Sequence, residues 1–188
     1  MKTNVTLPHL GGHLNRTHVD LGALIFLLET FRPKTALDIG CGPFGMLPLF
    51  TQLGISAIGL DGDPNVGLGS NHIIRHDFTN GPLRLHTKFD LAWSVEFLEH
   101  VEAEFVPDVM SAFNLCTVAC VTAAPPGHAG HHHVNCQPQS YWEEVFSGYG
   151  FEFLERETEE IRRRSTMAKG FMQRTGMIFQ KMRRDRYA

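Results

Sequence analysis

The sequence lacks a hydrophobic run long enough to cross a membrane. Its longest apolar stretch, residues 21–28 (LGALIFLL), spans eight residues, whereas a membrane helix needs about 20. The N-terminal sequence MKTNVTLPHLGG also has no apolar segment of the kind found in secretory signal peptides. We therefore expect no membrane association and a cytoplasmic location.

Cysteine is scarce, and its spacing excludes two common uses. The four cysteines stand at positions 41, 116, 120 and 136. No CxxC pair is present, so neither a disulfide framework nor a zinc knuckle is indicated. We expect reduced thiols.

The chain has neither an internal repeat nor a linker, and its 188 residues with 43% hydrophobic content suit a single domain, residues 1–188. Apolar runs alternate with helical patterns, which predicts an α/β sheet. Residues 1–34 form an N-terminal helical segment in this prediction, and 156–174 form an insertion between the last two strands. Strands are expected at 36–39, 56–60, 72–76, 89–94, 117–122, 151–154 and 177–182, and helices at 17–31, 44–53, 103–115, 139–149 and 158–164.

The sequence ALDIGCGPFG, residues 36–45, predicts a strand, a tight glycine turn and a helix. Such a turn lets a ligand approach the backbone, and the helix N-terminus offers unpaired N–H groups. Asp38 lies two residues before Gly40, where its carboxylate would repel a pyrophosphate but tolerate a cationic ligand. S-adenosylmethionine, with its ammonium and sulfonium groups, is such a ligand.

Two further carboxylates follow the next two expected strands. Asp61 comes 21 residues after Gly40, where a carboxylate can bind both ribose hydroxyls. Asp77 is followed by Phe78, a pair that suits the amino group and the face of an adenine ring. Each aspartate could instead cap a turn, but three at successive strand ends favour a nucleotide-like ligand.

The motifs ALDIGCGPFG, GLDGDP, RHDFTNGP and FDLAWSVEFLEHVE resemble those of the class I S-adenosylmethionine-dependent methyltransferases. The resemblance implies a Rossmann-like three-layer sandwich with a seven-stranded, mostly parallel sheet whose last strand is antiparallel. One departure is Phe44, where the family often has a third glycine. The resemblance implies these cofactor-binding residues: Asp38, Gly40, Cys41, Gly42, Asp61, Gly62, Asp77, Phe78 and Ser94.

Two segments are expected beside the methyl group: SVEFLEH (94–100) and the loop 123–137, which contains HAGHHHVN. Histidine is the usual side chain for removing a proton at neutral pH. In an extended loop His131 and His133 would point one way and His132 the other. We predict His133 as the catalytic base, with His131 second and Glu96 as a further catalytic residue; a solvent-facing loop is the alternative.

No metal is required by this interpretation, but an alternative set of metal ligands exists. Glu96, Glu99 and His100 would share one face of a helix, and His133 would complete a site for Mg²⁺ or Mn²⁺. This set resembles that of the metal-dependent small-RNA 3′-terminal 2′-O-methyltransferases.

The charge distribution bears on the partner. Residues 156–188 hold ten Lys/Arg and four Asp/Glu, whereas residues 1–155 hold seven and sixteen. A basic region can contact an anionic partner, including nucleic acid, or can be a solvated surface.

For the insertion at residues 156–174 we predict a lid or an acceptor-binding element, or else a packed surface helix. The sequence thus predicts a methyltransferase acting on a small, possibly anionic acceptor at O or N, with the RNA enzyme and a non-catalytic nucleotide-binding module as alternatives.

Overall fold

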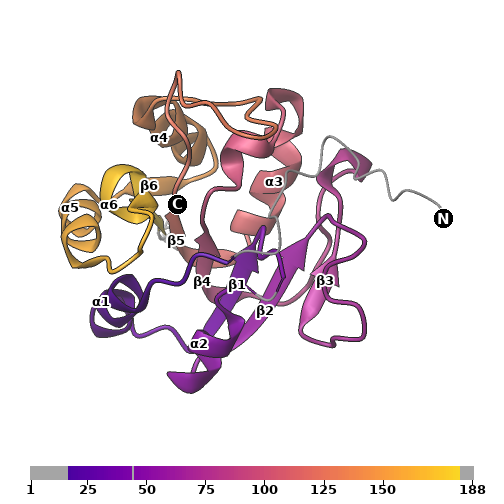
Figure 1. The fold of residues 1–188 in the computed structure, drawn as a ribbon, viewed down its shortest axis with the longest axis horizontal. Helices are drawn as coiled ribbons and strands as arrows, with labels where there is room; N and C mark the ends of the chain where they lie inside the picture. The colour runs from indigo at the N-terminus through magenta and orange to yellow at the C-terminus, as the bar shows by residue number, and fades with distance from the viewer. Residues whose placement is uncertain (1–16, 44, 183–188) are drawn as a thin grey trace, which may run out of the picture.

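The fold is described from a computed structural model, which places residues 17–43 and 45–182. Its centre is a seven-stranded sheet with the strand order β3-β2-β1-β4-β5-β7-β6 (Figure 1). The elements are α1 (Leu21–Phe31), β1 (Thr35–Ile39), α2 (Leu47–Gln52), β2 (Ser56–Asp61), β3 (Ile73–Arg75), η2 (Phe78–Asn80), β4 (Phe89–Ser94), η3 (Leu98–His100), η4 (Ala103–Phe105), α3 (Val106–Phe113), β5 (Cys116–Val121), α4 (Gln139–Gly148), β6 (Phe151–Phe153), α5 (Glu155–Arg164), α6 (Phe171–Thr175) and β7 (Met177–Lys181).

The sheet is parallel except at β7, which runs antiparallel to both of its neighbours, β5 and β6. The predicted seven-stranded sheet with an antiparallel last strand is confirmed. The chain order reverses between β1 and β4, and open α/β sheets bind ligands at such a switch point, beyond the carboxyl ends of the strands.

Helices cover both faces of the sheet, which makes the three layers. Alternate residues of β5 enter different cores, since Val118 and Cys120 pack with α1, α2, α5 and α6, whereas Ala119 and Val121 pack with α3 and α4. A sheet buried on both faces requires this nearly continuous apolar strand sequence. Among the described residues, no helix is long and apolar enough to span a membrane.

Several predicted bounds need correction. The first helix begins at Leu21 rather than at residue 17, because the Asp20 side chain caps it by accepting the Ala23 N–H. The predicted helix 103–115 is a short 3₁₀ turn followed by α3, and the strand predicted at 72–76 has only three residues. The helix predicted at 158–164 starts earlier, at Glu155.

Asp20 also joins the N-terminal helix to the segment after α5. Its fully buried carboxylate accepts hydrogen bonds from the Ser165 hydroxyl and from the Thr166 N–H, at 2.9 Å in the second case. Gly22 allows the close approach, since a Cβ there would lie 2.0 Å from the Arg164 carbonyl oxygen. Residues about 145 positions apart in the sequence are thereby held together (Figure 1).

We expect Asp20→Ala to lower the free energy of unfolding by about 3 kcal/mol, because a helix cap and two buried hydrogen bonds to a charged group are lost. The Glu29→Ala variant is the matched control. It breaks the exposed Glu29–Arg164 ion pair between the same two helices and should cost less than about 1 kcal/mol. Urea denaturation measures both, and equal losses would contradict the role given to Asp20.

Candidate functional site

A cavity of about 360 Å³ lies at the point between β1 and β4 where the strand order reverses, beyond the carboxyl ends of β1, β2 and β4. Residues from the glycine turn, from the ends of three strands and from the loop after β5 line it. The predicted site residues in its wall are Asp38, Gly40, Cys41, Gly42, Asp61, Gly62, Asp77, Phe78, Glu96, His100, His131 and His133.

The glycine turn follows β1 and is shaped by close contacts that a side chain would prevent. Gly40 has a φ of 73°, and a Cβ there would lie 2.5 Å from the ring of Phe97. Gly42 donates its N–H to the Asp61 carboxylate at 2.7 Å, so the turn is tied directly to the end of β2. The backbone of the turn and the carboxylate of Asp61 therefore form one side of the cavity.

Asp61 and Asp77 are both oriented by local hydrogen bonds. Asp61 also accepts the Asp63 N–H at 2.9 Å. Asp77 accepts the Thr79 N–H and hydroxyl and caps the 3₁₀ helix η2. From the sequence, capping a turn and contacting a ligand were alternative roles for Asp77. In the structure Asp77 both caps η2 and lines the cavity. Phe78 and Phe97 add aromatic surface to the same wall.

Asp38 lies at the inner end of the cavity and is almost completely buried. It accepts the Met46 N–H at 2.8 Å. Burial raises the pKa of Asp38 to about 7; the Met46 hydrogen bond opposes this rise, and the charge of Asp61 adds to it. A cationic ligand beside Asp38 would favour its ionised form.

Two of the predicted cofactor residues are almost completely buried, although Cys41, in the turn after β1, still lines the cavity. Ser94 is fully buried, its hydroxyl donates to the Ile39 carbonyl, and it is absent from the described cavity wall. Cys41 packs against Gly59, where a Cβ would lie 2.6 Å from the Cys41 Sγ, and burial raises the pKa of its thiol. Phe44, the departure from the family pattern, lies outside the described residues.

Glu96 follows β4 and adopts a left-handed backbone conformation, with a φ of 52°. Thr122 fixes it from both directions: the Glu96 N–H donates to the Thr122 hydroxyl, and that hydroxyl donates to the Glu96 carboxylate, both at 2.9 Å. Burial raises the pKa of Glu96, and the Thr122 hydrogen bond opposes the rise. Non-glycine residues in this conformation cluster at functional sites.

A second chamber of about 390 Å³ adjoins the first. Glu96 and Phe171 line both chambers. The second one contains Arg162, Arg174 and Trp142, and the buried indole N–H of Trp142 has no hydrogen-bond partner among the described residues. The chamber is therefore rich in hydrogen-bond donors.

The histidine loop differs from its predicted shape. Residues 131 and 132 form a turn, and His132 has a φ of 50°, so the alternation expected of an extended loop is wrong. His131, His132 and His133 all line the first cavity. The loop is attached to η3 because the N–H groups of Val134 and Asn135 both donate to the Glu99 carbonyl at 3.0 Å.

Glu96, Glu99 and His100 do not share a helical face, which corrects a second prediction. Glu96 precedes the 3₁₀ helix η3, and Glu99 and His100 are neighbours within it. The structure instead brings Glu99 and His100 together with His133. Burial raises the pKa of Glu99 to about 8, with the charge of Glu96 adding to the rise, and burial lowers the pKa of His100 to about 4.

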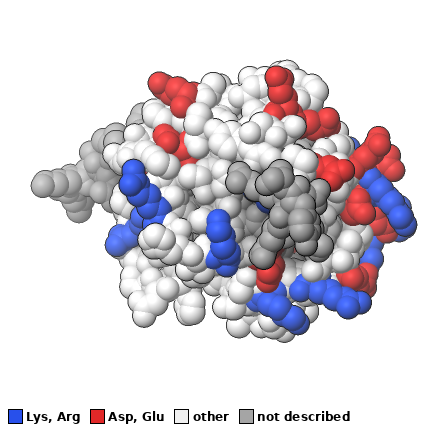
Figure 2. Space-filling model, turned by 180° about the vertical axis from the view of Figure 1, so that it is seen from behind, with Lys and Arg blue, Asp and Glu red and all other residues white. Residues whose placement is uncertain are grey.

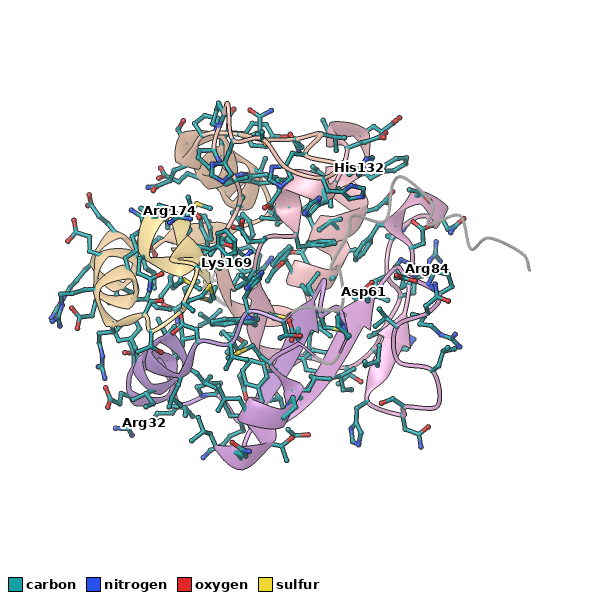
Figure 3. The ribbon with its side chains drawn as sticks, in the orientation of Figure 1. Arg32, Asp61, Arg84, His132, Lys169 and Arg174 are labelled. Atoms are coloured by element: carbon teal, nitrogen blue, oxygen red, sulfur yellow. The ribbon has the colours of Figure 1, made fainter. Side chains whose placement is uncertain are left out.

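The cavity is covered from both ends of the described chain. His18 contacts Phe171 edge to face, with ring centroids 4.9 Å apart, and both residues line the cavity. Figure 3 shows Asp61, His132 and Lys169 on different sides of it. Met167, Phe171 and Met172 in the predicted insertion had indicated a cover of this kind, but nothing in the sequence indicated that Phe97 would pack on Gly40.

In the described part of the basic C-terminal region, the three consecutive arginines of α5 contact other groups of the molecule, whereas Arg183, Arg184 and Arg186 lie outside the described residues. Arg162 donates to the Gly176 carbonyl and to Gln139, and Arg163 and Arg164 pair with Glu160 and Glu29. In Figure 2, blue and red side chains are interleaved along the edge of the molecule where α5 lies. These arginines therefore do not form a uniform basic surface.

Comparison with known proteins gives one family match. The profile of a family described as "Methyltransferase domain" matches residues 13–118, more than half of the chain. A comparison with curated proteins gives no match.

Many solved structures share the fold at low sequence identity. The plantazolicin methyltransferase BpumL in complex with SAH has a TM-score of 0.58 and 13% identity, covering 86% of this chain and 81% of that chain. The magnesium protoporphyrin IX methyltransferase ChlM from Synechocystis PCC 6803 with bound SAM has a TM-score of 0.59 and 14% identity, with coverages of 85% and 76%. The [4+2]-cyclase SpnF has a TM-score of 0.57 and 15% identity, covering 85% and 81%.

Proposed function

Because this chain belongs to the methyltransferase-domain family, we propose that it transfers a methyl group from S-adenosylmethionine to a small acceptor at O or N. The observation that carries the proposal is the pair of adjoining chambers with Glu96 in the wall of both. One chamber suits the cofactor and the other suits the acceptor. Two solved structures of the same fold contain SAM or SAH, which supports the choice of cofactor.

The residues of the first chamber fit S-adenosylmethionine. Asp38, buried and adjacent to the glycine turn, would hold the cationic methionine end. Asp61 would accept hydrogen bonds from the ribose hydroxyls, and Asp77 with Phe78 would hold the adenine. A pyrophosphate fits poorly, because three carboxylates line this wall.

The second chamber favours an acceptor that carries a carboxylate or a phosphate. Arg174 lines it, and guanidinium groups bind such anions through paired hydrogen bonds. Arg162 lines it as well, but its Nε and Nη2 groups already donate to Gly176 and Gln139. The acceptor atom would lie near Glu96, where the two chambers meet.

The chemistry asked of the protein is positioning and proton removal. When bound, S-adenosylmethionine supplies an electrophilic methyl group. The chambers hold the two reactants in line, and the Glu96 carboxylate takes the acceptor's proton. Thr122 holds the Glu96 carboxylate in place. The histidines predicted as bases, His133 and His131, also line the cofactor chamber, but only Glu96 among the three lines both.

RNA as the acceptor is not favoured by the described surface. Arg162, Arg163 and Arg164 are engaged in contacts within the molecule. Phosphate binding along a nucleic acid needs several cations that are accessible together.

Calorimetric titration with S-adenosylhomocysteine, the demethylated product, tests the proposal. We expect one binding event, with a dissociation constant in the micromolar range that is usual for enzyme ligands. The titration is followed by transfer of a labelled methyl group to a panel of small hydroxyl and amine acceptors. Absence of binding by both cofactor and product would overturn the proposal.

The Arg174→Gln variant tests the anionic acceptor. We expect KM to rise about tenfold for an acceptor with a carboxylate, since one charge-assisted hydrogen bond is lost, and to change little for its uncharged amide. Arg163→Gln is the control, because Arg163 is exposed and pairs with Glu160 outside the chamber. An equal rise in KM for both acceptors would show that Arg174 does not bind the acceptor's charge.

A further inference from the structure

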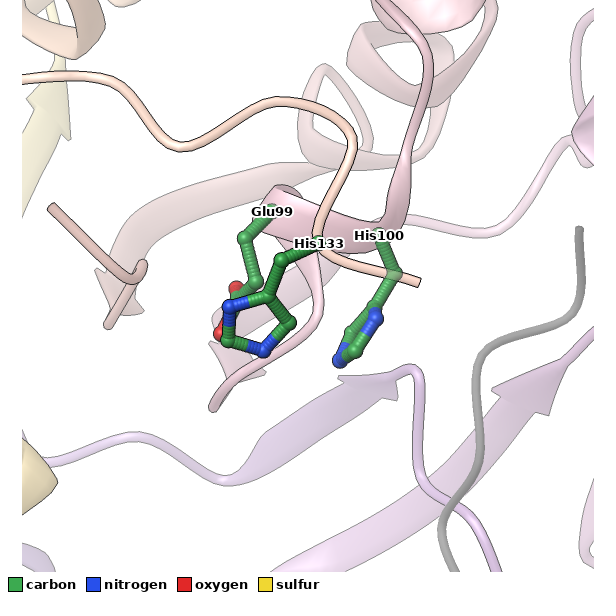
Figure 4. Close-up of side chains that lie close together, drawn as sticks. All are labelled: Glu99, His100 and His133. Atoms are coloured by element: carbon green, nitrogen blue, oxygen red, sulfur yellow. The ribbon is translucent and has the colours of Figure 1, made fainter. Parts of the chain in front are cut away.

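Three metal-ligand side chains meet at the edge of the cofactor chamber. Glu99, His100 and His133 each place one ligand atom within 4.8 Å of those of the other two. Figure 4 shows the three side chains converging from η3 and from the loop after β5. His100 and His133 contact edge to face, with ring centroids 5.0 Å apart.

Each of the two imidazoles is oriented by a backbone carbonyl. The Nδ1 of His100 lies 3.1 Å from the His132 carbonyl oxygen, and the Nδ1 of His133 lies 3.0 Å from that of His128. A carbonyl only accepts, so each Nδ1 is the donor, and in the neutral form of each ring the Nε2 keeps the lone pair that a metal would bind. Histidines that bind metals are held in this way by a hydrogen bond from the other ring nitrogen.

The buried side chain of Glu99 also points to a bound cation. Its side chain is 0% exposed, and the Glu96 carboxyl group and the Ala124 N–H lie beside its carboxylate without making a hydrogen bond of normal geometry with either oxygen. An unsatisfied buried carboxylate is costly, and a bound cation would remove that cost. The loop N–H groups that donate to the Glu99 carbonyl hold His133 beside it.

Gly130 makes room for the His133 ring. A Cβ at Gly130 would lie 2.1 Å from the Nε2 atom of His133. The loop backbone therefore packs closely against this imidazole, which holds the His133 ring in a defined position.

We propose that Glu99, His100 and His133 bind one divalent transition-metal ion. Two imidazoles and one carboxylate are the ligands of catalytic zinc sites and of other first-row metal sites that keep open positions. Metal–ligand bonds are about 2.1 Å long. The three ligand atoms would therefore have to move toward a shared ion by roughly 1 Å or less, through rotation of their side chains. His100 and His133 both line the first cavity, so an ion held by them would lie at its edge. Metal binding at these three residues stands independently of the proposed function.

The test measures metal binding directly on the full chain. Protein stripped with a chelator is titrated with Zn²⁺ and Mn²⁺ by calorimetry, and bound metal is counted by elemental analysis. We expect about one ion per chain, and Glu99→Gln and His133→Gln each to weaken binding by more than roughly tenfold. His131→Gln is the matched control, since His131 belongs to the same loop and lines the same cavity but lies outside the group of three.

Gly130→Ala is a second variant that keeps all three ligands. It should weaken metal binding by displacing the His133 ring, with the melting temperature changed by only a few degrees. Cobalt(II) absorption in the visible range reports the ligand set of the wild type and should disappear in His133→Gln. Substoichiometric metal in the wild type, or equal losses in His131→Gln and His133→Gln, would overturn the proposal.

Binding of S-adenosylhomocysteine to the same proteins separates the two proposals. Glu99→Gln should still bind it, because Glu99 is absent from the described cavity wall. Metal binding without cofactor binding would overturn the methyltransferase proposal alone, and the reverse result would overturn the metal site alone.

Discussion

Glu96→Gln is expected to lower the rate of methyl transfer by about a thousandfold, within the range typical of general acid–base catalysis. Glutamine matches glutamate in size, and its carbonyl can still accept the Thr122 hydroxyl, so the local structure should persist. The amide cannot take the acceptor's proton. Single-turnover rates with labelled S-adenosylmethionine measure the loss.

The control for this prediction is Glu144→Gln, a change to an exposed carboxylate on α4. It should leave the rate unchanged within about twofold, since it lies on the solvent side of its helix. Binding of S-adenosylhomocysteine should be the same in both variants. A Glu96→Gln enzyme that retains most of its rate would show that the acceptor loses its proton to another group or to solvent.

Asp61→Asn is expected to weaken binding of S-adenosylhomocysteine by about 30-fold to 100-fold. Hydrogen bonds to a charged group contribute about 1.5–3 kcal/mol each, and Asp61 also holds the N–H of Gly42 in the glycine turn. The variant therefore weakens a ligand contact and loosens the turn that approaches the ligand. Calorimetric titration gives the affinity directly.

Asp90→Asn separates this effect from a general loss of stability. Asp90 accepts hydrogen bonds from the N–H groups of Lys34 and Thr35 at the opposite, amino end of β4 and β1. We expect its substitution to reduce stability while the affinity for S-adenosylhomocysteine stays unchanged. An equal loss of affinity in both variants would remove the specific role proposed for Asp61.

The cofactor side of the site was predictable from the sequence because its residues are local to strand ends. Asp38, Asp61 and Asp77 each follow or end a short apolar strand, and parallel strands bring their carboxyl ends to one edge. The antiparallel last strand came from the resemblance to a family, not from periodicity, and the strand order was not predicted. Helix starts were less well predicted, since the start of α1 depends on the Asp20 cap.

The acceptor side was less predictable because it depends on contacts between distant segments. Thr122 fixes Glu96 across adjacent strand ends, and the loop is held to η3 at the Glu99 carbonyl. The prediction that alternate histidines of the loop point in opposite directions was wrong, because residues 131 and 132 form a turn. The close approach of Gly130 to the His133 ring depends on how the loop folds, so it could not be predicted from the loop sequence.

The position of β7 has a consequence for synthesis of the chain on the ribosome. β7 comes after every other strand in the sequence, yet it lies between β5 and β6 in the sheet. Until residues 177–181 emerge, β5 is an edge strand of apolar sequence, the kind of surface that pairs with other chains. A chain cut short before Met177 therefore loses an interior strand and leaves its sheet open to aggregation.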